Sequence, residues 1–368
     1  MKIAIDTYGC DHGKSGLGSY LINFISNIPA DCEDKIELFG SEIDRYTYKS
    51  EKEITYNAVL PFENERLEDL WHLRKINKFL SKNDYDVVIY PAVEKVLPLK
   101  FKTKGVAVVN SVISAAIRNF DSSKKRHLKK GLQKVQLIIA ASEFIKDDLL
   151  KLGIDSSKII VIHNGIDHKR FFPCDDPFSD VVEINPFSIK KPYFLYCSRL
   201  SDSDKKHEQL IKAFNIFKSK TNAPHRLVIS GDDGEYSEKI HRVAFDSEFA
   251  SDILITGFFP HESLPKLYSG AAACVFPATK EGVGLPILES MASGIPVLCS
   301  NSGVLPEVGG DVPLYFNSDD VYDIAYSMQR IVSDQDLASE LVKKGLEWAA
   351  NFNWSDTVIK TLEAARKI

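Results

Sequence analysis

The sequence has few cysteines, and none of them is arranged like a metal ligand or a redox pair. Six cysteines are spread over 368 residues without a Cys-x-x-Cys pair. Each lies in or near an apolar or mixed run, which is typical of reduced thiols that fill space in a core. They are Cys10, Cys32, Cys174, Cys197, Cys274 and Cys299. We therefore expect free thiols in a reducing cytoplasm, and no metal site.

Long apolar runs and an excess of positive charge are also missing. No apolar stretch reaches about 18 residues, so no transmembrane helix is expected. The chain opens with the strand-like run MKIAID and shows no signal-peptide pattern, which argues against secretion. The formal net charge of -5 argues against a general nucleic-acid binder. A length of 368 residues suits two domains better than one core.

Short apolar runs alternate with segments of helical period in two series. Most runs are apolar throughout, which is typical of parallel strands covered by helices on both faces. The sequence therefore predicts an α/β protein with two doubly wound, Rossmann-like domains. The expected strands are 2–6, 35–40, 86–91, 105–110, 137–142 and 158–164 in the first series, and 193–200, 226–231, 253–258, 273–278, 296–300 and 313–316 in the second.

The proline-rich and acidic segment 171–192 has no clear period and predicts the domain boundary. We expect an N-terminal domain over 1–175 and a C-terminal domain over 176–350. Residues 351–368 predict a final helix that packs back on the N-terminal domain, capped by Asn353 or Ser355.

Six cations gather in the segment KKRHLKKGLQK at 124–134. A solvated helix face explains this pattern. The alternative is peripheral contact with an anionic inner-membrane surface, where each basic residue contributes about 1 kcal/mol.

Ligands of open parallel sheets bind beyond the carboxyl ends of the strands, so the loops there are the candidate sites. After the first strand, Gly16 and Gly18 precede a helical pattern that begins near Ser19, and either a phosphate contact or a plain turn would explain them. After 193–200, Arg199 and Lys205 offer a planar donor and a compact charge for a diphosphate. Two surface charges are the alternative reading, and Lys206 is a rival for the lysine role.

The segment EGVGLPILE is the richest candidate. A glycine turn at 282–284 leads into a helix from about Pro286, and backbone N–H groups at Gly284 and Leu285 would face an anion. Glu281 and Glu289 flank this turn, and a carboxylate binds vicinal hydroxyls of a hexose or a ribose through paired hydrogen bonds. A capping glutamate and an exposed helical glutamate would give the same spacing.

At these residues the sequence resembles the family-4 glycosyltransferases, which have the GT-B fold. The matching pieces occur in the family's order over about 1–20 and 137–355: R-L-x(4)-K-x-H-E-x-L-I-x-A-F, L-Y-S-G-A, E-G-x-G-L-P-x-L-E-x-M-A-x-G-x-P-V and P-E-V-x-G-D. The resemblance implies two domains facing across a cleft, and hexose transfer from a nucleotide diphosphate sugar with retention of configuration, without a metal or another cofactor.

Site roles follow from the resemblance residue by residue. Arg199 and Lys205 would hold the donor diphosphate, Glu281 the hexose hydroxyls, and Glu289 the ribose diol. The remaining donor contacts would come from Gly16 and Gly18 of the N-terminal domain, from Gly231, Gly257 and Phe258 beside the base, and from Gly282, Val283, Gly284 and Leu285 at the phosphate and sugar.

The chain departs from the family at Asn110 and Ser111, where many relatives carry His-Asp on the sugar and acceptor side. Asn110 can hydrogen-bond a hydroxyl but cannot take a proton near neutral pH. Val283 is a second departure, since an aromatic residue is common there.

The leading hypothesis is a cytoplasmic hexosyltransferase of surface polysaccharide or glycoconjugate synthesis, with a glycan or lipid-linked acceptor. The Lys-x-His-Glu variant resembles the mannosyltransferase-type members, and this resemblance implies GDP-mannose as the donor, while UDP-hexoses and dTDP-rhamnose stay open. A catalytically weakened module that binds a nucleotide sugar or a partner is the alternative. A sugar phosphorylase or an NAD-dependent enzyme is less favoured, because the Gly-x-Gly near residue 16 lacks a third glycine.

Overall fold

The computed structural model describes residues 1–59, 65–95, 97–174, 179–259 and 263–368. The chain divides into two compact units, Met1–Gly165 together with Asn353–Ile368, and Ile166–Phe352. The boundary predicted at 175/176 lies outside the described residues.

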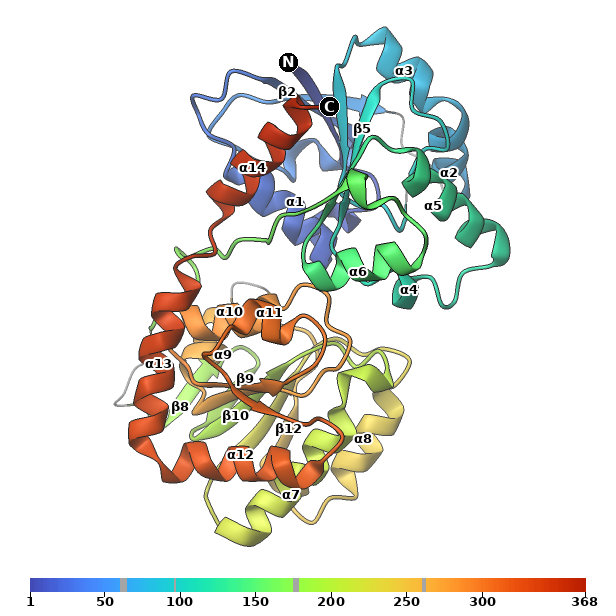
Figure 1. Cartoon of the computed structure of the whole chain (residues 1–368). Coiled ribbons are helices and arrows are strands. Elements are labelled where there is room, and N and C mark those ends of the chain that lie inside the picture. Colours follow the sequence, from blue (N-terminus) through green and yellow to red (C-terminus); the bar gives the residue numbers. More distant parts are fainter. Residues whose placement is uncertain (60–64, 96, 175–178, 260–262) are drawn as a thin grey trace. The chain divides into compact units, whose positions relative to one another are not determined.

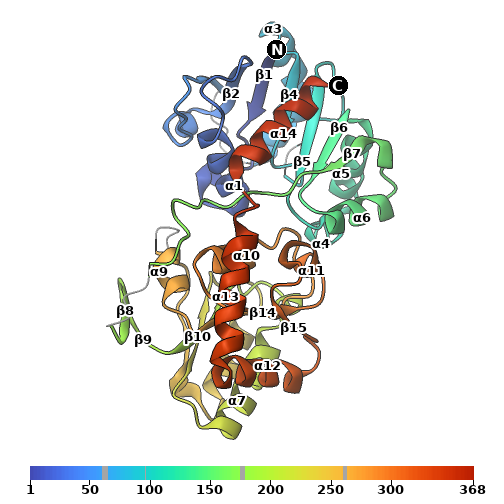
Figure 2. The same cartoon turned by 60° about the vertical axis from the view of Figure 1, so that its left-hand side comes forward.

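A parallel seven-stranded sheet forms the centre of the first unit (Figures 1 and 2). Its strand order is β3-β2-β1-β4-β5-β6-β7. All side chains of β4 and β6 are buried, as their continuous apolar sequences predict. The strands are β1 (Lys2–Asp6), β2 (Lys35–Ser41), β3 (Thr55–Val59), β4 (Val87–Tyr90), β5 (Lys104–Val109), β6 (Leu137–Ala140) and β7 (Ile159–Val161).

Helices cover this sheet, and the last helix of the chain is one of them. The indole of Trp354 on α14 packs against Tyr20 of α1, with ring centroids 5.4 Å apart. The carboxylate of Asp34 binds both the amino terminus and Arg366 of α14. Figures 1 and 2 show α14, in red, beside α1. The helices are α1 (Gly16–Ser26), α2 (Glu65–Arg74), α3 (Ile76–Lys82), α4 (Ile113–Ala116), α5 (Ser122–Lys134), α6 (Glu143–Lys151) and α14 (Trp354–Arg366), with short 3-10 turns at Asp11–Gly13, Glu42–Tyr46 and Ser156–Lys158.

The second unit has a parallel six-stranded sheet with the order β12-β11-β10-β13-β14-β15. Its strands are β10 (Tyr193–Cys197), β11 (Arg226–Ser230), β12 (Ile253–Ile255), β13 (Ala273–Phe276), β14 (Val297–Ser300) and β15 (Leu314–Phe316). Its helices are α7 (His207–Thr221), α8 (Ser237–Phe245), α9 (Leu264–Ser269), α10 (Leu285–Ala292), α11 (Leu305–Gly309), α12 (Val321–Ser333) and α13 (Gln335–Ala349), with 3-10 turns at Ser203–Lys205 and Ala250–Asp252. The predicted pair of doubly wound α/β folds is thus confirmed.

Three strands were not predicted. The edge strand β3 is half-exposed along its length, so its sequence TYNAV lacks the apolar run that marks the other strands. In the segment 171–192, expected to be irregular, an antiparallel pair forms between β8 (Val181–Ile184) and β9 (Phe187–Lys190). The first helix also begins earlier than predicted, at Gly16 instead of near Ser19, because the Ser15 hydroxyl accepts the N–H of Gly18 and caps it.

Among the described residues, no helix combines the length and the apolar character that a membrane span requires. Within the same ranges, no three His, Cys, Asp or Glu side chains are grouped as a metal site.

Candidate functional site

In the second sheet, the order in which successive strands are added reverses between β10 and β13. From β10 the chain builds outward through β11 and β12, and it then returns to the other side of β10 with β13. Because all these strands are parallel, the loops that follow β10 and β13 leave the same edge of the sheet side by side. Ligands of doubly wound folds bind in the crevice at such a switch point.

A pocket of about 210 Å³ lies at this position. It contains Arg199 after β10, Lys205 at the end of the 3-10 turn Ser203–Lys205, and Glu281 after β13. The structure thus brings together three residues that are well separated in the sequence: the first, Arg199, and the last, Glu281, are 82 positions apart (281 minus 199). Its apolar walls include Tyr196, Phe276 and Ile287.

Glu281 and Lys205 form an ion pair in this pocket. The Lys205 ammonium lies 2.8 Å from the Glu281 carboxylate, and the two side chains are 23% and 24% exposed. Burial raises the pKa of Glu281, but Lys205 and the backbone N–H groups of Gly284 and Val283 outweigh it and hold the pKa below its usual range. The Glu281 carboxylate therefore accepts hydrogen bonds from the backbone N–H groups of the glycine turn. One of these N–H groups, at Gly284, was expected from the sequence to face a bound anion.

The two adjacent lysines point to different partners. Lys206 has a left-handed backbone, with φ of 56°, at the start of α7, and its ammonium binds Asp319 at 2.7 Å. Lys205 lines the pocket and binds Glu281. This geometry favours Lys205 over Lys206 for a role in the pocket.

The turn before α10 depends on glycine at one position. Gly284 has φ of +72°, and a Cβ there would lie 2.6 Å from Cγ2 of Val308. Only glycine fits this combination of backbone and packing. Helix α10 then begins at Leu285 with Pro286 in its first turn, while Val283 is half-buried and Gly282 is buried.

Glu289 lies one turn further along α10. Its carboxylate accepts a hydrogen bond of 3.1 Å from the Tyr268 hydroxyl on α9. Burial raises the pKa of Glu289 to about 7, against the opposing effects of Tyr268 and of the positive charge of Arg170. The two acids thus differ: the surroundings of Glu281 favour its ionised form, and burial of Glu289 disfavours its ionised form.

The glycines at the neighbouring strand ends have different surroundings. Gly231 follows β11, and a Cβ there would lie 2.1 Å from the carbonyl oxygen of Ser198, so glycine lets the two loops touch. Gly257 follows β12 with φ of +71° and open space around it, and its carbonyl accepts the Gly231 N–H at 3.0 Å. The ring of Phe258 is 61% exposed.

His207, the first residue of α7, belongs to the Lys-x-His-Glu motif but was assigned no site role from the sequence. Its ring is 1% exposed and packs against Tyr196, with centroids 4.9 Å apart. Burial lowers its pKa to about 4, so the ring is neutral beside Lys205. Tyr268 and Arg170 were missed as well, because each comes from a segment distant in sequence from Glu289.

The other predicted residues belong to the first unit. A Cβ at Gly18 would lie 2.5 Å from the Cys10 carbonyl oxygen, so this glycine serves packing, whereas Gly16 has open space around it. Asn110 follows β5, and its side-chain oxygen accepts a bond of 3.0 Å from Asn164.

Comparisons with known proteins agree with this arrangement. Residues 32–170 match the family model "Glycosyltransferase Family 4", and residues 180–348 match "Glycosyl transferases group 1". The O-antigen chain mannosyltransferase B of Escherichia coli is 24% identical over 379 residues, covering 99% of this chain and 99% of the relative. The serotype-specific mannosyltransferase WbdA of Escherichia coli is 31% identical over 244 residues, covering 64% of this chain and 29% of the relative.

Solved structures share the fold. Sucrose-phosphate synthase of Thermosynechococcus elongatus superposes with a TM-score of 0.76 at 19% identity, over 100% of this chain and 98% of that one. Anabaena HepE in complex with UDP and glucose has a TM-score of 0.76 at 16% identity, over 100% of both chains. The two halves of the chain thus match two glycosyltransferase family models, and together with the mannosyltransferase relatives and the structural neighbours this leads to one conclusion: the chain is a glycosyltransferase with the GT-B fold.

Proposed function

We propose that this chain transfers a mannosyl residue from GDP-mannose to a glycan or lipid-linked acceptor, with retention at the anomeric carbon and without a metal ion. One observation carries the proposal: a single pocket holds Arg199, Lys205 and Glu281 at the switch point of the second sheet. The names of relatives that are O-antigen mannosyltransferases support mannose as the sugar.

The pocket suits this reaction through its charges. In the transfer, the bond between the anomeric carbon and the diphosphate oxygen breaks, a bond to the acceptor oxygen forms, and the proton of the acceptor hydroxyl passes to the departing diphosphate. Negative charge develops on the departing diphosphate, where Arg199 and Lys205 would stabilise it in place of a metal. The ionised Glu281 would accept hydrogen bonds from the hexose hydroxyls, and Glu289 from the ribose diol.

Entry of the donor requires a local exchange of partners. Lys205 and the N–H groups of Val283 and Gly284 now bind the Glu281 carboxylate. A diphosphate that takes over Lys205 would leave that carboxylate to the sugar hydroxyls. The ion pair thus already brings together two of the groups that the donor would engage.

Calorimetric titration with GDP, UDP and dTDP tests which nucleotide the donor carries. Hydrolysis of GDP-mannose or transfer of its mannose in the presence of EDTA tests whether the reaction proceeds without a metal ion. We expect a preference for GDP and activity that survives EDTA. Equal affinity for all three nucleotides would refute the choice of donor. Tight GDP binding without hydrolysis or transfer would favour the alternative, a binding module, for which Asn110 in place of the family's histidine is the motivating observation.

We further propose that the protein works in the cytoplasm and touches the inner membrane through residues 124–134. Helix α5 buries Leu128, Gly131 and Leu132, half-buries Lys124 and Lys125, and leaves four cations exposed, namely Arg126, Lys129, Lys130 and Lys134. Co-sedimentation with vesicles of phosphatidylglycerol at low and high salt tests this contact. Equal binding to neutral phosphatidylcholine vesicles would contradict an electrostatic attachment.

A further inference from the structure

Three hydrogen bonds hold the main chain on either side of Lys205. On one side, the carbonyl oxygen of Asp204 accepts the Thr279 N–H at 2.9 Å and the Thr279 hydroxyl at 3.3 Å. On the other side, the carbonyl oxygen of Lys205 itself accepts the Tyr196 hydroxyl at 2.8 Å. The main chain of Lys205 is therefore tied to two neighbouring segments, so that only its side chain has to move when a ligand takes it from Glu281.

The loop that follows β13 contacts the same turn through charges as well. The Lys280 ammonium lies 3.2 Å from the Asp204 carboxylate, and the Lys205 ammonium lies 2.8 Å from the Glu281 carboxylate. Three consecutive residues, 279–281, thus contact the two consecutive residues Asp204 and Lys205. Because β10 and β13 are paired in the sheet, these contacts join the two loops just beyond the carboxyl ends of paired strands.

The donor of the last of these bonds, Tyr196, belongs to the core of the second unit. Its side chain is fully buried on β10, and its ring packs against His207 and Phe276 with centroids 4.9 Å and 5.5 Å away. This packing fixes the ring and with it the direction of the hydroxyl. Phenylalanine at this position would keep the packing and leave the Lys205 carbonyl without this donor.

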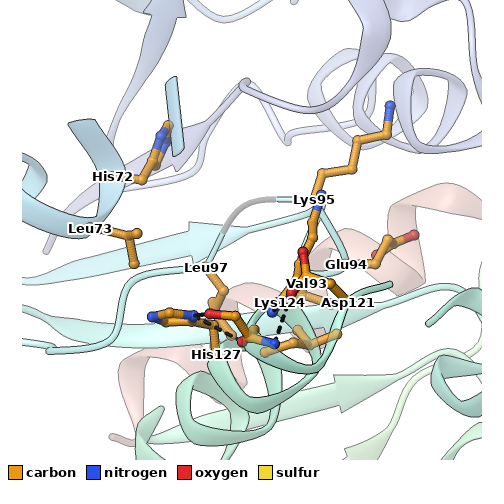
Figure 3. Close-up of a pocket in the computed structure, with 11 residues that line it drawn as sticks. His72, Leu73, Val93, Glu94, Lys95, Leu97, Asp121, Lys124 and His127 are labelled. Carbon is orange, nitrogen blue, oxygen red and sulfur yellow. Dashed lines mark hydrogen bonds between the residues drawn. The ribbon is translucent and has the colours of Figure 1, made fainter. Parts of the chain in front are cut away.

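A lysine of the first unit is held less firmly. Lys95 lines a pocket of about 230 Å³, and Figure 3 shows its side chain extending away from Asp121 and Lys124. Its ammonium pairs with Asp11 at 2.6 Å, and both side chains are 42% exposed. The Lys205 side chain is 23% exposed. Exposed ion pairs contribute little, whereas a cation held in place by its surroundings stabilises developing charge without reorganisation at the moment of reaction.

The position of the Lys205 ammonium matters for the departing diphosphate, because a displacement of about 1 Å can cost about a hundredfold in rate. Since Lys205 is paired with Glu281, which would hold the hexose, the phosphate within its reach is the one that carries the sugar. We propose that Tyr196 and Thr279 are positioning residues, which fix the main chain of Lys205 so that its ammonium meets this phosphate. The proposal rests on the proposed function, because it takes Lys205 to bind the donor diphosphate.

Calorimetric titration with GDP and with GMP at pH 8, where the terminal phosphates are ionised, tests this role without requiring activity. GMP lacks the phosphate that Lys205 would bind, so the ratio of the Kd for GMP to the Kd for GDP reports on the Lys205 contact. Tyr196→Phe should lower this ratio about threefold to tenfold, the equivalent of one hydrogen bond. Thr279→Val should lower it less, because the Thr279 N–H remains, and Thr279→Ser should keep the wild-type ratio.

Tyr193→Phe is the matched control. Tyr193 is also fully buried, at the other end of β10, and its hydroxyl donates to the carbonyl oxygen of Leu267 at 2.6 Å. Both phenylalanine variants should lose stability in urea titrations, but only Tyr196→Phe should lower the ratio. In a Lys205→Met background, Tyr196→Phe should leave the ratio unchanged, because the ammonium through which Tyr196 acts is gone.

A wild-type ratio in Tyr196→Phe overturns the positioning role, as does a fall of equal size in Tyr193→Phe or in the Lys205→Met background. These results leave the proposed function intact, because the wild-type chain still binds GDP and transfers mannose. GDP binding without transfer refutes the proposed function, and the ratio still decides the positioning role. A wild-type chain that binds none of GDP, UDP and dTDP refutes both.

Discussion

Replacing Glu281 by glutamine should separate nucleotide binding from transfer. The carboxylate receives the Lys205 ammonium at 2.8 Å and the N–H groups of Val283 and Gly284. Glutamine keeps the shape and one oxygen acceptor but removes the charge. The variant therefore weakens each of these contacts without opening a cavity.

The stability cost follows from the difference between charged and neutral hydrogen bonds. A bond to a charged group contributes about 1.5–3 kcal/mol and a neutral one about 1 kcal/mol, so the exchange costs about 1 kcal/mol at this partly solvated site. In a unit of this size, the melting temperature should fall by about 2–4 °C. Because the pKa of Glu281 is lowered, its contribution is complete above the ordinary value of 4.5 and is lost only as pH falls through the folded-state pKa, so the difference is fully expressed at pH 7.

Nucleotide binding and mannosyl transfer should respond to Glu281→Gln differently from stability. GDP has no hexose, and the variant removes a negative charge beside Lys205, so GDP affinity should be equal or tighter. The value of kcat/KM for GDP-mannose should fall by about tenfold to a hundredfold through the lost sugar contact. Calorimetry with GDP and a radiolabelled transfer assay measure the two effects, with Glu238→Gln, 94% exposed on α8, as control. Weakened GDP binding with unchanged transfer would refute this account of Glu281.

The other predictions concern single residues around the same pocket. Arg199→Ala should raise the calorimetric Kd for GDP about tenfold or more without a change in melting temperature, and unchanged affinity would refute its phosphate role. Affinity for GDP-mannose, whose diphosphate does not titrate in this range, should fall as pH drops from 8 to 6, because Glu289, with a pKa of about 7, gains a proton and loses acceptor capacity for the ribose; in Glu289→Gln this dependence should vanish, and its persistence would implicate another group. His207 should add no step in that range, since its pKa is about 4. Gly284→Ala should lower the free energy of unfolding by about 2 kcal/mol in urea titrations, because φ is +72° and the Cβ meets Val308; wild-type stability would contradict the argument from backbone strain.

The parallel strands were predictable because they are buried on both faces. Runs such as Val87–Tyr90 and Leu137–Ala140 need no alternation of polar and apolar residues, so their apolar character alone marks them. The same reasoning misses β3, which is half-exposed at the edge of the first sheet, and the β8–β9 pair, which lies outside both parallel sheets. These strands carry too little apolar sequence to stand out.

The candidate site was predictable where local chemistry and strand ends coincide. Arg199, Lys205 and Glu281 follow strands that the structure places side by side. The contact between Tyr268 and Glu289 depends on how α9 packs against α10, which no local pattern encodes. The buried His207 is similar, because its sequence at the start of α7 is polar and gives no sign that the ring is buried.

The central claim is that the pocket around Glu281 transfers mannose from GDP-mannose. The most direct measurement is the consumption of radiolabelled GDP-mannose, UDP-glucose and dTDP-rhamnose by the purified chain in EDTA, compared between wild type and Glu281→Gln. The account predicts that GDP-mannose alone is consumed at an appreciable rate and that the variant loses this activity while still binding GDP. Preference for another donor, or wild-type activity in the variant, would contradict it.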